Sequence, residues 1–315
     1  MAANVVGRIG QVNQSGGVEA SFLKVFGGEV INTFDELNVI SPHVVMRNIS
    51  SGKTAQFPVT GVAAAAYHVP GAQLLGQNTM MHSEKTIGID GVLLSHESIA
   101  EIDEKMSHWE TRSEYARKMG AALAIKSDQQ QLQVMLLAAR ASATLTGGNG
   151  GTALTDSDAA TNATSLAATA YTCSQTFDEA DVPEDGRVLC VRPAQYYLLA
   201  QETGLIDTDF SAANGDYSKA QIKMVGGLQI IKSNHIPSTT LSAETGVSAT
   251  NTYHGVFGTT VAVAFQKGAI GTVKLMDIAV ESEWQISRQS TLLVTKMAVG
   301  HGILRPECAI EIKTA

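Results

Sequence analysis

The sequence of 315 residues contains little cysteine, and its cysteines form no pattern. Cys173, Cys190 and Cys308 are widely separated, and no C-x-x-C pair occurs. Neither a zinc site nor a disulfide framework is indicated, because both require cysteines at characteristic spacings. We therefore expect three reduced thiols that are at least partly buried, as is usual for isolated cysteines in a reducing compartment.

Charge is also scarce. Charged residues make up 17% of the chain, and its formal net charge is −8. An acidic chain is a poor candidate for tight DNA binding, because phosphate contacts require Lys and Arg. The low charge is more typical of a protein whose surface is largely covered by neighbours. An acidic wall also suits a container that encloses DNA without adhering to it.

Long apolar runs are missing as well. No run approaches the 20 or so apolar residues that a membrane-spanning helix needs. The first 15 residues lack the charged start and the apolar core of a secretion signal. We therefore expect neither a membrane span nor export by a signal peptide.

The residue patterns of common catalytic and metal sites are not found. The eight histidines include no H-x-x-x-H pair, and no G-x-S-x-G motif occurs. The carboxylates of Glu101, Asp103 and Glu104 are interpreted as a solvated helix face. The sequence therefore predicts no catalytic residue, no metal site and no cofactor.

One motif, Ser50-Ser51-Gly52-Lys53-Thr54, looks like the end of a phosphate-binding loop. The full motif has a glycine five residues before Gly52, where this chain has Arg47. A phosphate loop also leads from a strand into a helix, whereas strand character continues here through Phe57. The sequence therefore argues against nucleotide binding at Lys53.

The first hundred residues predict an arm and a long hairpin. Residues 1–17 are small, polar and Gly-rich, and we expect a mobile arm there. Residues 44–59 and 85–93 alternate like strands, and a tip rich in Ala, Gly and Pro at residues 61–77 separates them. Such a hairpin has few core residues and cannot stand alone in water, so it must lie against another domain or subunit.

A long helix is predicted at residues 107–141, which contain no proline and one glycine. Tyr115, Met119 and Leu123 share one face at four-residue steps. About 30 helical residues extend roughly 45 Å.

The second half of the chain mixes strands and a helix. Residues 144–170 are dominated by small and polar residues, and residues 147–151 are predicted as a loop tip. Strands are predicted at residues 187–191, 228–231, 256–265, 271–283, 291–298 and 309–312, and a helix with proline in its first turn at 193–201. This order indicates an α+β fold built as one discontinuous domain.

Both ends of the chain carry distinctive sequence blocks. The most distinctive, RNISSGKTAQFP, runs from Arg47 to Pro58. The others begin at Phe22 (FLKVFGGEV), Ala65 (AAY), His82 (HSEK), Ile89 (IDG), Arg112 (RSEY), Gly271 (GTVKL), Ala298 (AVGHG) and Leu304 (LRPE). In this shared order the blocks resemble the major capsid proteins of short-tailed bacteriophages of the T-seven-like group. The middle of the chain, residues 144–269, resembles that family in pattern only.

The resemblance implies the Hong-Kong-97-type capsid fold. In that fold an extended hairpin, the E-loop, lies over a neighbouring subunit, and a long spine helix runs through the peripheral domain. The implied divisions are an N-terminal arm at 1–45, the E-loop with flanking strands at 46–94, the peripheral domain with the spine helix at 95–143, an axial domain at 144–270, and returning peripheral strands at 271–315.

The function that the resemblance implies is that of a major capsid protein. Such a chain self-assembles as hexamers and pentamers into an icosahedral shell around packaged double-stranded DNA, without sequence-specific DNA binding. The implied partners are a scaffolding protein during assembly, a portal at one vertex and a decoration protein. The implied location is the virion capsid, assembled in the cytoplasm of the bacterial host.

Within the family blocks we expect Lys53, Gln56, Phe57, Tyr67 and Arg305 at the assembly interface. The family is more basic just after GTVKL, where this chain has Glu281-Ser282-Glu283-Trp284, so no contact is transferred to that stretch. Two alternatives stay open. An encapsulin-like nanocompartment shares the fold but encloses enzymes, and the RNISSGKTAQFP block argues against it. A nucleotide-binding enzyme would be built on Gly52-Lys53-Thr54.

Overall fold

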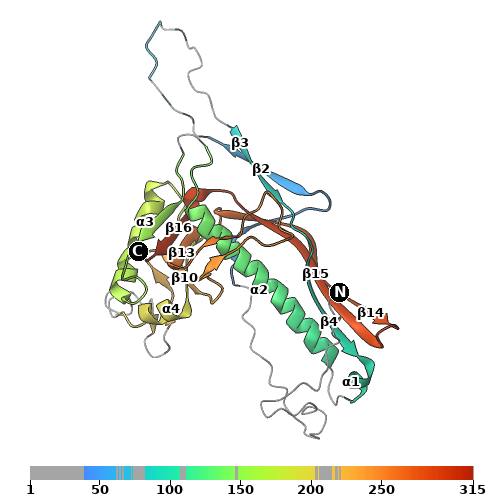
Figure 1. The fold of residues 1–315 in the computed structure, drawn as a ribbon. Helices are drawn as coiled ribbons and strands as arrows, with labels where there is room; N and C mark the ends of the chain where they lie inside the picture. Colours follow the sequence, from blue (N-terminus) through green and yellow to red (C-terminus); the bar gives the residue numbers. More distant parts are fainter. Residues whose placement is uncertain are drawn as a thin grey trace. The chain divides into compact units, whose positions relative to one another are not determined.

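The computed structural model describes residues 39–61, 63, 65, 67–71, 73, 82–106, 111–145, 148–202, 205, 215–216, 219 and 221–314. The predicted mobile arm lies outside these residues. The described chain forms two compact units, a smaller one of residues 91–127 and 275–299 and a larger one drawn from residues 39–90, 128–274 and 300–314. Helices and strands occur in both (Figure 1), so the predicted α+β class is confirmed.

A six-stranded sheet forms the centre of the larger unit. Its order is β5 (Thr152–Thr155), β16 (Ala309–Lys313), β13 (Thr260–Gln266), β6 (Arg187–Val191), β10 (Leu228–Lys232) and β9 (Met224–Val225). The sheet is mixed, because β6 pairs in parallel with β10 and antiparallel with β13. All five residues of β6 are buried, which explains its uninterrupted run of largely apolar residues.

Three helices contribute to the core of this unit: the second half of α2 (Thr111–Ala139), α3 (Ala163–Glu179) and α4 (Pro193–Leu199). Figure 1 shows α3 and α4 at the same side of the sheet. The helices α2 and α4 confirm the prediction, and α4 begins at Pro193 as expected. The sequence assigned no element to α3, although Leu166, Ala170, Cys173 and Phe177 recur at helical spacing and form its buried face.

The smaller unit packs α2 against a sheet. Here β4 (Leu93–Ala100) pairs antiparallel with β15 (Ser290–Ile303), from Ala100 opposite Ser290 to Leu93 opposite Met297. Met119 of α2 packs with Ile99 and Leu293, and Tyr115 adds to this cluster. Leu123 packs with Met297 and Val299. The apolar face predicted for the long helix is therefore confirmed.

The predicted strand at residues 44–59 is divided in two. β1 (Val45–Asn48) pairs in parallel with the start of β14 (Ile270–Gln285), and β2 (Thr54–Thr60) pairs with β3 (His82–Gly88). Gly52 lies between β1 and β2 with a φ of +109°, in the left-handed region where glycine carries no steric penalty. The second predicted strand, at residues 85–93, matches only the end of β3, and β4, which starts at Leu93, was not predicted.

Short elements complete the described chain. They are the pairs β7 (Gly215–Asp216) with β8 (Gln221–Ile222) and β11 (Thr240–Leu241) with β12 (Gly255–Val256), the helix α1 (Glu101–Met106), and the 3-10 turns Ser41–His43 and Pro306–Cys308. None of the helices in the described ranges is long and apolar enough to cross a membrane.

The prediction for α1 was partly wrong. Asp103 is completely buried rather than solvated, whereas Glu101 and Glu104 are partly exposed. A short run of acidic residues predicts a solvent-exposed helix face. Which of these acids is buried depends on the packing around α1. The prediction for the cysteines is confirmed, because all three are free and buried.

An ion pair between the exposed Arg140 and the buried Glu311 fastens the end of α2 to the six-stranded sheet. The guanidinium of Arg140 donates to both carboxylate oxygens of Glu311 at 2.6 Å, and Glu311 is completely buried. Arg140 also donates to the carbonyl of Val256 at 2.6 Å and lies over the ring of Phe257. The hydrogen bond from Glu311, followed by its charge, raises the pKa of Arg140. The two-pronged geometry, in which both carboxylate oxygens accept from one guanidinium, is typical of a strong Arg–carboxylate contact.

Replacing Arg140 with methionine is expected to lower the free energy of unfolding by about 3–5 kcal/mol, because Glu311 is left buried without its counter-charge. The matched control is Arg117→Met, because Arg117 pairs with Glu114 on an exposed stretch of the same helix. Arg117→Met is expected to lower the free energy of unfolding by less than about 1 kcal/mol. Urea denaturation measures both, and equal losses would contradict the account given for Arg140.

Candidate assembly surface

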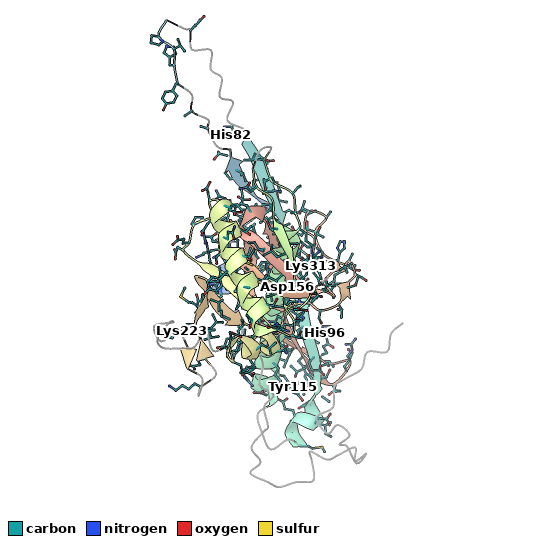
Figure 2. All side chains as sticks on the ribbon, turned by 90° about the vertical axis from the view of Figure 1, so that its left-hand side faces the viewer. His82, His96, Tyr115, Asp156, Lys223 and Lys313 are labelled. Carbon is teal, nitrogen blue, oxygen red and sulfur yellow. The ribbon has the colours of Figure 1, made fainter. Side chains whose placement is uncertain are left out.

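The β2–β3 ribbon extends outward from the core of the larger unit. Ala55, Ile87 and Gly88 are buried at one end, whereas Thr60 and His82 are exposed at the other. Figure 2 shows His82 where the ribbon runs out from the body. Among the described residues the ribbon is a sheet of two strands, so the outer edge of each strand is unpaired. Unpaired edges of this kind readily accept another strand or chain.

One side chain, Asn251, joins the root of this ribbon to the larger unit. Its Oδ1 accepts from the backbone N–H of Gly88 at 3.2 Å, and its Nδ2 donates to the carbonyl of Gly88 at 2.8 Å. Asn251 thereby satisfies both backbone groups of a buried residue, as a neighbouring strand would. Without the Asn251 side chain, two buried polar groups of Gly88 lose their partners. Each such loss lowers the free energy of unfolding by about 1–3 kcal/mol.

Asp90 orients this amide from the other side. Its Oδ1 accepts from Nδ2 of Asn251 and from the backbone N–H of Ser248, each at 2.8 Å. Its Oδ2 accepts a short hydrogen bond from the hydroxyl of Tyr253, and that hydroxyl accepts from the backbone N–H of His301 at 2.9 Å. Burial, followed by the charge of Asp90, raises the pKa of Tyr253, so the phenol keeps its proton and remains a donor.

Glycines make room for the root. A Cβ at Gly300 would lie 1.9 Å from the carbonyl oxygen of Gly88, and one at Gly302 would lie 2.8 Å from Ile87. Ile87 is almost completely buried and also lies beside Gly271. The root of the ribbon therefore packs against glycines of β14 and β15. Glycine within a strand often marks such a close approach of another backbone or side chain.

His301 lies beneath this root and stays neutral. It is completely buried, and its Nδ1 lies 2.9 Å from the hydroxyl of Thr272. Burial lowers the pKa of His301 to about 3, far below its ordinary value of about 6.5. His301 therefore carries no charge near neutral pH and acts as a packed, hydrogen-bonded side chain.

The five predicted interface residues all belong to the larger unit. Lys53, Gln56, Tyr67 and Arg305 are exposed, and Phe57 is half-buried. Phe57 lies under the guanidinium of Arg47, which also donates to the carbonyl of Gln56 at 2.9 Å. Lys53, Gln56 and Phe57 therefore lie on or beside one strand, whereas Arg305 precedes the turn at Pro306–Cys308. The contribution of each residue to assembly remains a prediction.

The residues that fix the root were not predicted. Asn251 and Tyr253 carry no motif, Asp90 was noted only as part of the IDG block, and their contacts join positions about 160 residues apart. A signal was nevertheless present, because Gly300 and Gly302 stand at alternate positions just after the strand predicted at residues 291–298. Glycines within a strand indicate a close approach by another backbone or side chain.

The motif at Gly52-Lys53-Thr54 does not form a phosphate loop. Lys53 is exposed and leads directly into β2, and its carbonyl accepts from the N–H of Ile89 at 2.8 Å. A phosphate loop leads instead into a helix whose N-terminus faces the ligand. The local structure therefore argues against a phosphate-binding site at Gly52-Lys53-Thr54, the motif on which the nucleotide-binding alternative was based.

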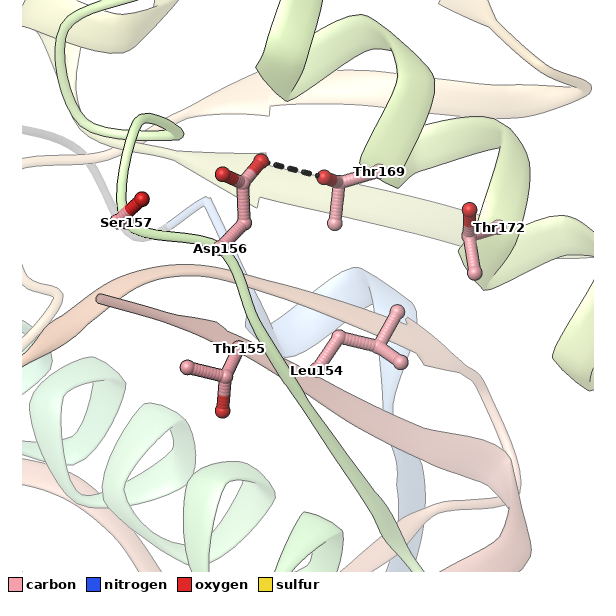
Figure 3. A pocket seen from close by; sticks show the side chains of 6 residues that line it. All are labelled: Leu154, Thr155, Asp156, Ser157, Thr169 and Thr172. Carbon is pink, nitrogen blue, oxygen red and sulfur yellow. Dashed lines mark hydrogen bonds between the residues drawn. The ribbon is translucent and has the colours of Figure 1, made fainter. Parts of the chain in front are cut away.

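A pocket of about 390 Å³ lies between β5 and α3 (Figure 3), lined by Leu154, Thr155, Asp156, Ser157, Thr169 and Thr172. Oδ2 of Asp156 accepts from the hydroxyls of Ser165 and Thr169 at 2.6 and 2.8 Å. The hydrogen bond from Ser165 is the largest cause of a lowered pKa at Asp156. This ionised carboxylate links β5 to α3, and the pocket offers it no acid or base as a catalytic partner.

Replacing Gly300 with alanine is expected to displace the ribbon root and to lower the free energy of unfolding by about 1–3 kcal/mol, as overpacking commonly does. The control is Gly258→Ala, because a Cβ there meets no atom within 4 Å. Urea denaturation gives the free energies, and hydrogen exchange at the amide of Gly88 reports the root itself. An unchanged exchange rate at Gly88 in Gly300→Ala would disprove the close contact.

Comparisons with known proteins agree with these features. The family model described as Gp10A-like major capsid protein matches residues 56–313. The chain is 31% identical to the major capsid protein of Escherichia phage T7, with 98% of each chain covered, and 30% identical to that of Enterobacteria phage T3, with 92% and 90% covered. The solved capsid structure of cyanophage P-SCSP1u is 39% identical with a TM-score of 0.85, covering 100% of this chain and 99% of that one.

A more distant likeness concerns the fold alone. The mature capsid of bacteriophage PhiM1 is 17% identical with a TM-score of 0.78, over 98% of this chain and 97% of that one. Nothing in these comparisons favours an encapsulin or an enzyme. A family match over most of the chain, a near-complete alignment to two phage proteins and the rooted ribbon lead to one conclusion: the chain belongs to the Gp10A-like family of phage major capsid proteins and has the Hong-Kong-97-type capsid fold.

Proposed function

We propose that this chain assembles as hexamers and pentamers into an icosahedral shell that encloses packaged double-stranded DNA. The observation that carries this proposal is the β2–β3 ribbon, which is anchored at its root and exposed along its length. A ribbon of two strands gains little stability by itself, so its exposed part needs another surface to cover it. A neighbouring subunit in a shell provides that surface.

The predicted domain division is retained as part of the proposal. The arm comprises residues 1–45, the E-loop 46–94, the peripheral domain 95–143 and 271–315, and the axial domain 144–270. The β2–β3 ribbon would then be the E-loop and α2 the spine helix. The six-stranded sheet with α3 and α4 would form most of the axial domain. The strand β16 belongs to this sheet, although its residues fall in the range 271–315.

The ribbon's exposed side chains suit a contact between subunits. Lys53, Gln56 and Tyr67 are open to solvent, and Phe57 presents part of its ring beside Arg47. Tyrosine and arginine are enriched at protein interfaces, because they combine large area with directional hydrogen bonds. Each contact is small, but a closed shell repeats it at every subunit and so gains through multivalency.

The charge of the chain supports an enclosing role toward DNA. With a net charge of −8, the protein has no overall attraction for the phosphate backbone. We infer that the inner wall holds DNA by confinement, without sequence-specific contacts. We also propose a scaffolding protein during assembly, a portal at one vertex, a decoration protein on the outer face, and assembly in the bacterial host cytoplasm, as the resemblance implies.

Deleting residues 62–77 is expected to leave the subunit folded and to abolish shell formation, because the deletion removes the ribbon's tip and leaves the buried root intact. Negative-stain microscopy of the wild type is expected to show closed particles, and of the deletion variant none. Tyr67→Ser is the control for the loss of one exposed aromatic side chain at unchanged length. A strictly monomeric wild type would refute the proposed function, and normal particles from the deletion variant would refute the role of the ribbon.

Lys53→Ala is expected to keep the fold and to weaken particles modestly, because an exposed ion pair contributes at most about 1 kcal/mol per copy. The difference from wild type should be largest at low salt, where screening is weakest. Thermal disassembly, monitored by light scattering, measures this difference in particle stability. Lys223→Ala is the control, because it removes the same charge from the exposed residue before β9. ATP binding by the wild type that disappears in Lys53→Ala would contradict the shell interpretation of this residue.

A further inference from the structure

Two tyrosines of α4 hold the ammonium group of a lysine from the six-stranded sheet. Nζ of Lys232, in β10, lies 5.2 Å from the ring centre of Tyr196 and 5.7 Å from that of Tyr197. The two rings meet edge to face, with their centres 5.6 Å apart. A cation within about 6 Å of an aromatic face is attracted by the ring, so the two tyrosines restrain the side chain of Lys232.

A second lysine, Lys223, lies on the same face of the sheet. Its carbonyl accepts from the N–H of Ile230 at 3.0 Å, so Lys223 stands opposite Ile230 where the chain enters β9, the antiparallel neighbour of β10. Opposite side chains in such a pair point to one face, and so do residues two apart in a strand, such as Ile230 and Lys232. The N–H of Ile222 donates to the hydroxyl of Tyr196 at 3.2 Å. Lys223 and Lys232 therefore lie near the same aromatic ring.

Three side chains at this place are open to solvent. Lys223 and Lys232 are exposed, and Tyr197 is 47% exposed. Figure 2 shows Lys223 at the margin of the body. We call Lys223, Lys232 and Tyr197 the lysine–tyrosine surface.

The positive charge at this surface is not compensated within the part of the chain that the structure describes. No carboxylate there forms an ion pair with Lys223 or Lys232. Arg192, which precedes α4, adds a third positive charge and donates to the carbonyl of Pro237 at 2.8 Å. Burial lowers the pKa of Arg192, but a guanidinium stays charged near neutral pH. A chain with a net charge of −8 thus has a local cationic surface.

An acidic segment of a protein fits this surface better than DNA does. Carboxylates and phosphates can both pair with the two ammonium groups. The exposed ring of Tyr197 adds apolar area beside them, and tyrosine is enriched at protein interfaces. The outside of a DNA duplex presents phosphates and sugars, which offer little apolar surface to such a ring. The net charge of −8 also opposes the approach of a long polyanion.

We propose that the lysine–tyrosine surface binds a partner protein through a segment that carries carboxylates beside an apolar side chain. The carboxylates pair with Lys223 and Lys232, and the apolar side chain packs on Tyr197. The rings that restrain Lys232 reduce the side-chain entropy that is lost on binding. A single subunit carries the whole surface, so the inference does not depend on the proposed shell.

Peptides of defined composition test the chemistry of the partner. The probe is a fluorescein-labelled peptide in which pairs of Glu alternate with single Leu residues, and fluorescence anisotropy measures its binding to free full-length subunits at low salt. A peptide with Gln in place of every Glu is expected to bind at least about tenfold more weakly, a difference of about 1.4 kcal/mol. A peptide with Ser in place of every Leu is expected to bind about threefold more weakly, because Tyr197 then lacks an apolar partner.

Substitutions locate the binding site. Lys223→Ala/Lys232→Ala is expected to lower the affinity for the Glu–Leu peptide about tenfold. The matched control is Lys53→Ala/Lys267→Ala, because it removes two lysines that are also exposed in the larger unit, and it is expected to change the affinity less than about twofold. Tyr197→Ser is expected to abolish the preference for the Glu–Leu over the Glu–Ser peptide. The urea midpoints of both lysine variants are expected to equal that of the wild type.

The outcomes separate this inference from the proposed function. Equal binding of the Glu–Leu and Gln–Leu peptides, or equal losses in the two lysine variants, would show that the surface is not an acid-binding site. Tighter binding of a DNA duplex of the same total charge, abolished in Lys223→Ala/Lys232→Ala, would make it a phosphate site instead. Weaker shells of this chain alone in that variant would assign the surface to a second copy. A wild type without particles refutes the shell and leaves this inference standing, because peptide binding is measured on free subunits.

Discussion

The backbones of Gly88 and Gly300 approach so closely that no side chain fits between them, and the β2–β3 ribbon takes its position from that contact. The amide of Asn251 then pairs with both backbone groups of Gly88, and Asp90 and Tyr253 hold that amide in place. The root of the ribbon is thus fixed by packing and by hydrogen bonds with defined directions. Beyond the root, residues such as Thr60 and His82 are exposed.

Two side-chain pairs of the larger unit fasten segments that are distant in sequence. Arg140 and Glu311 join α2 to β16, across 171 residues. Asp128 accepts from the backbone N–H of Ile40 and lies 3.1 Å from Nδ1 of His235, which brings three segments together. A buried charge is tolerated only where partners compensate it, so each such group specifies one arrangement of the chain.

Local patterns predicted several of the longer regular elements. The strand β6 was expected at residues 187–191 and is found there, and the long helix was expected at 107–141 and is found at Thr111–Ala139. The helix α3 was missed because its Thr, Ser and Ala residues reduce the contrast between its two faces, although Asn162 caps it by accepting from the N–H of Thr164. The burial of Asp103 was missed because a run of acids predicts exposure by composition, and composition does not record what packs around a short helix.

The sequence by itself determined the family and the positions of several strands and helices. Both depend on information that is local along the chain: ordered blocks such as RNISSGKTAQFP, and periods of two or 3.6 residues. Only the tertiary structure decided that Asn251 meets Gly88 across 163 residues and that Gly300 must lack a side chain. Contacts of this kind leave no periodic trace in the sequence, because they arise only when strands far apart in the chain are placed side by side.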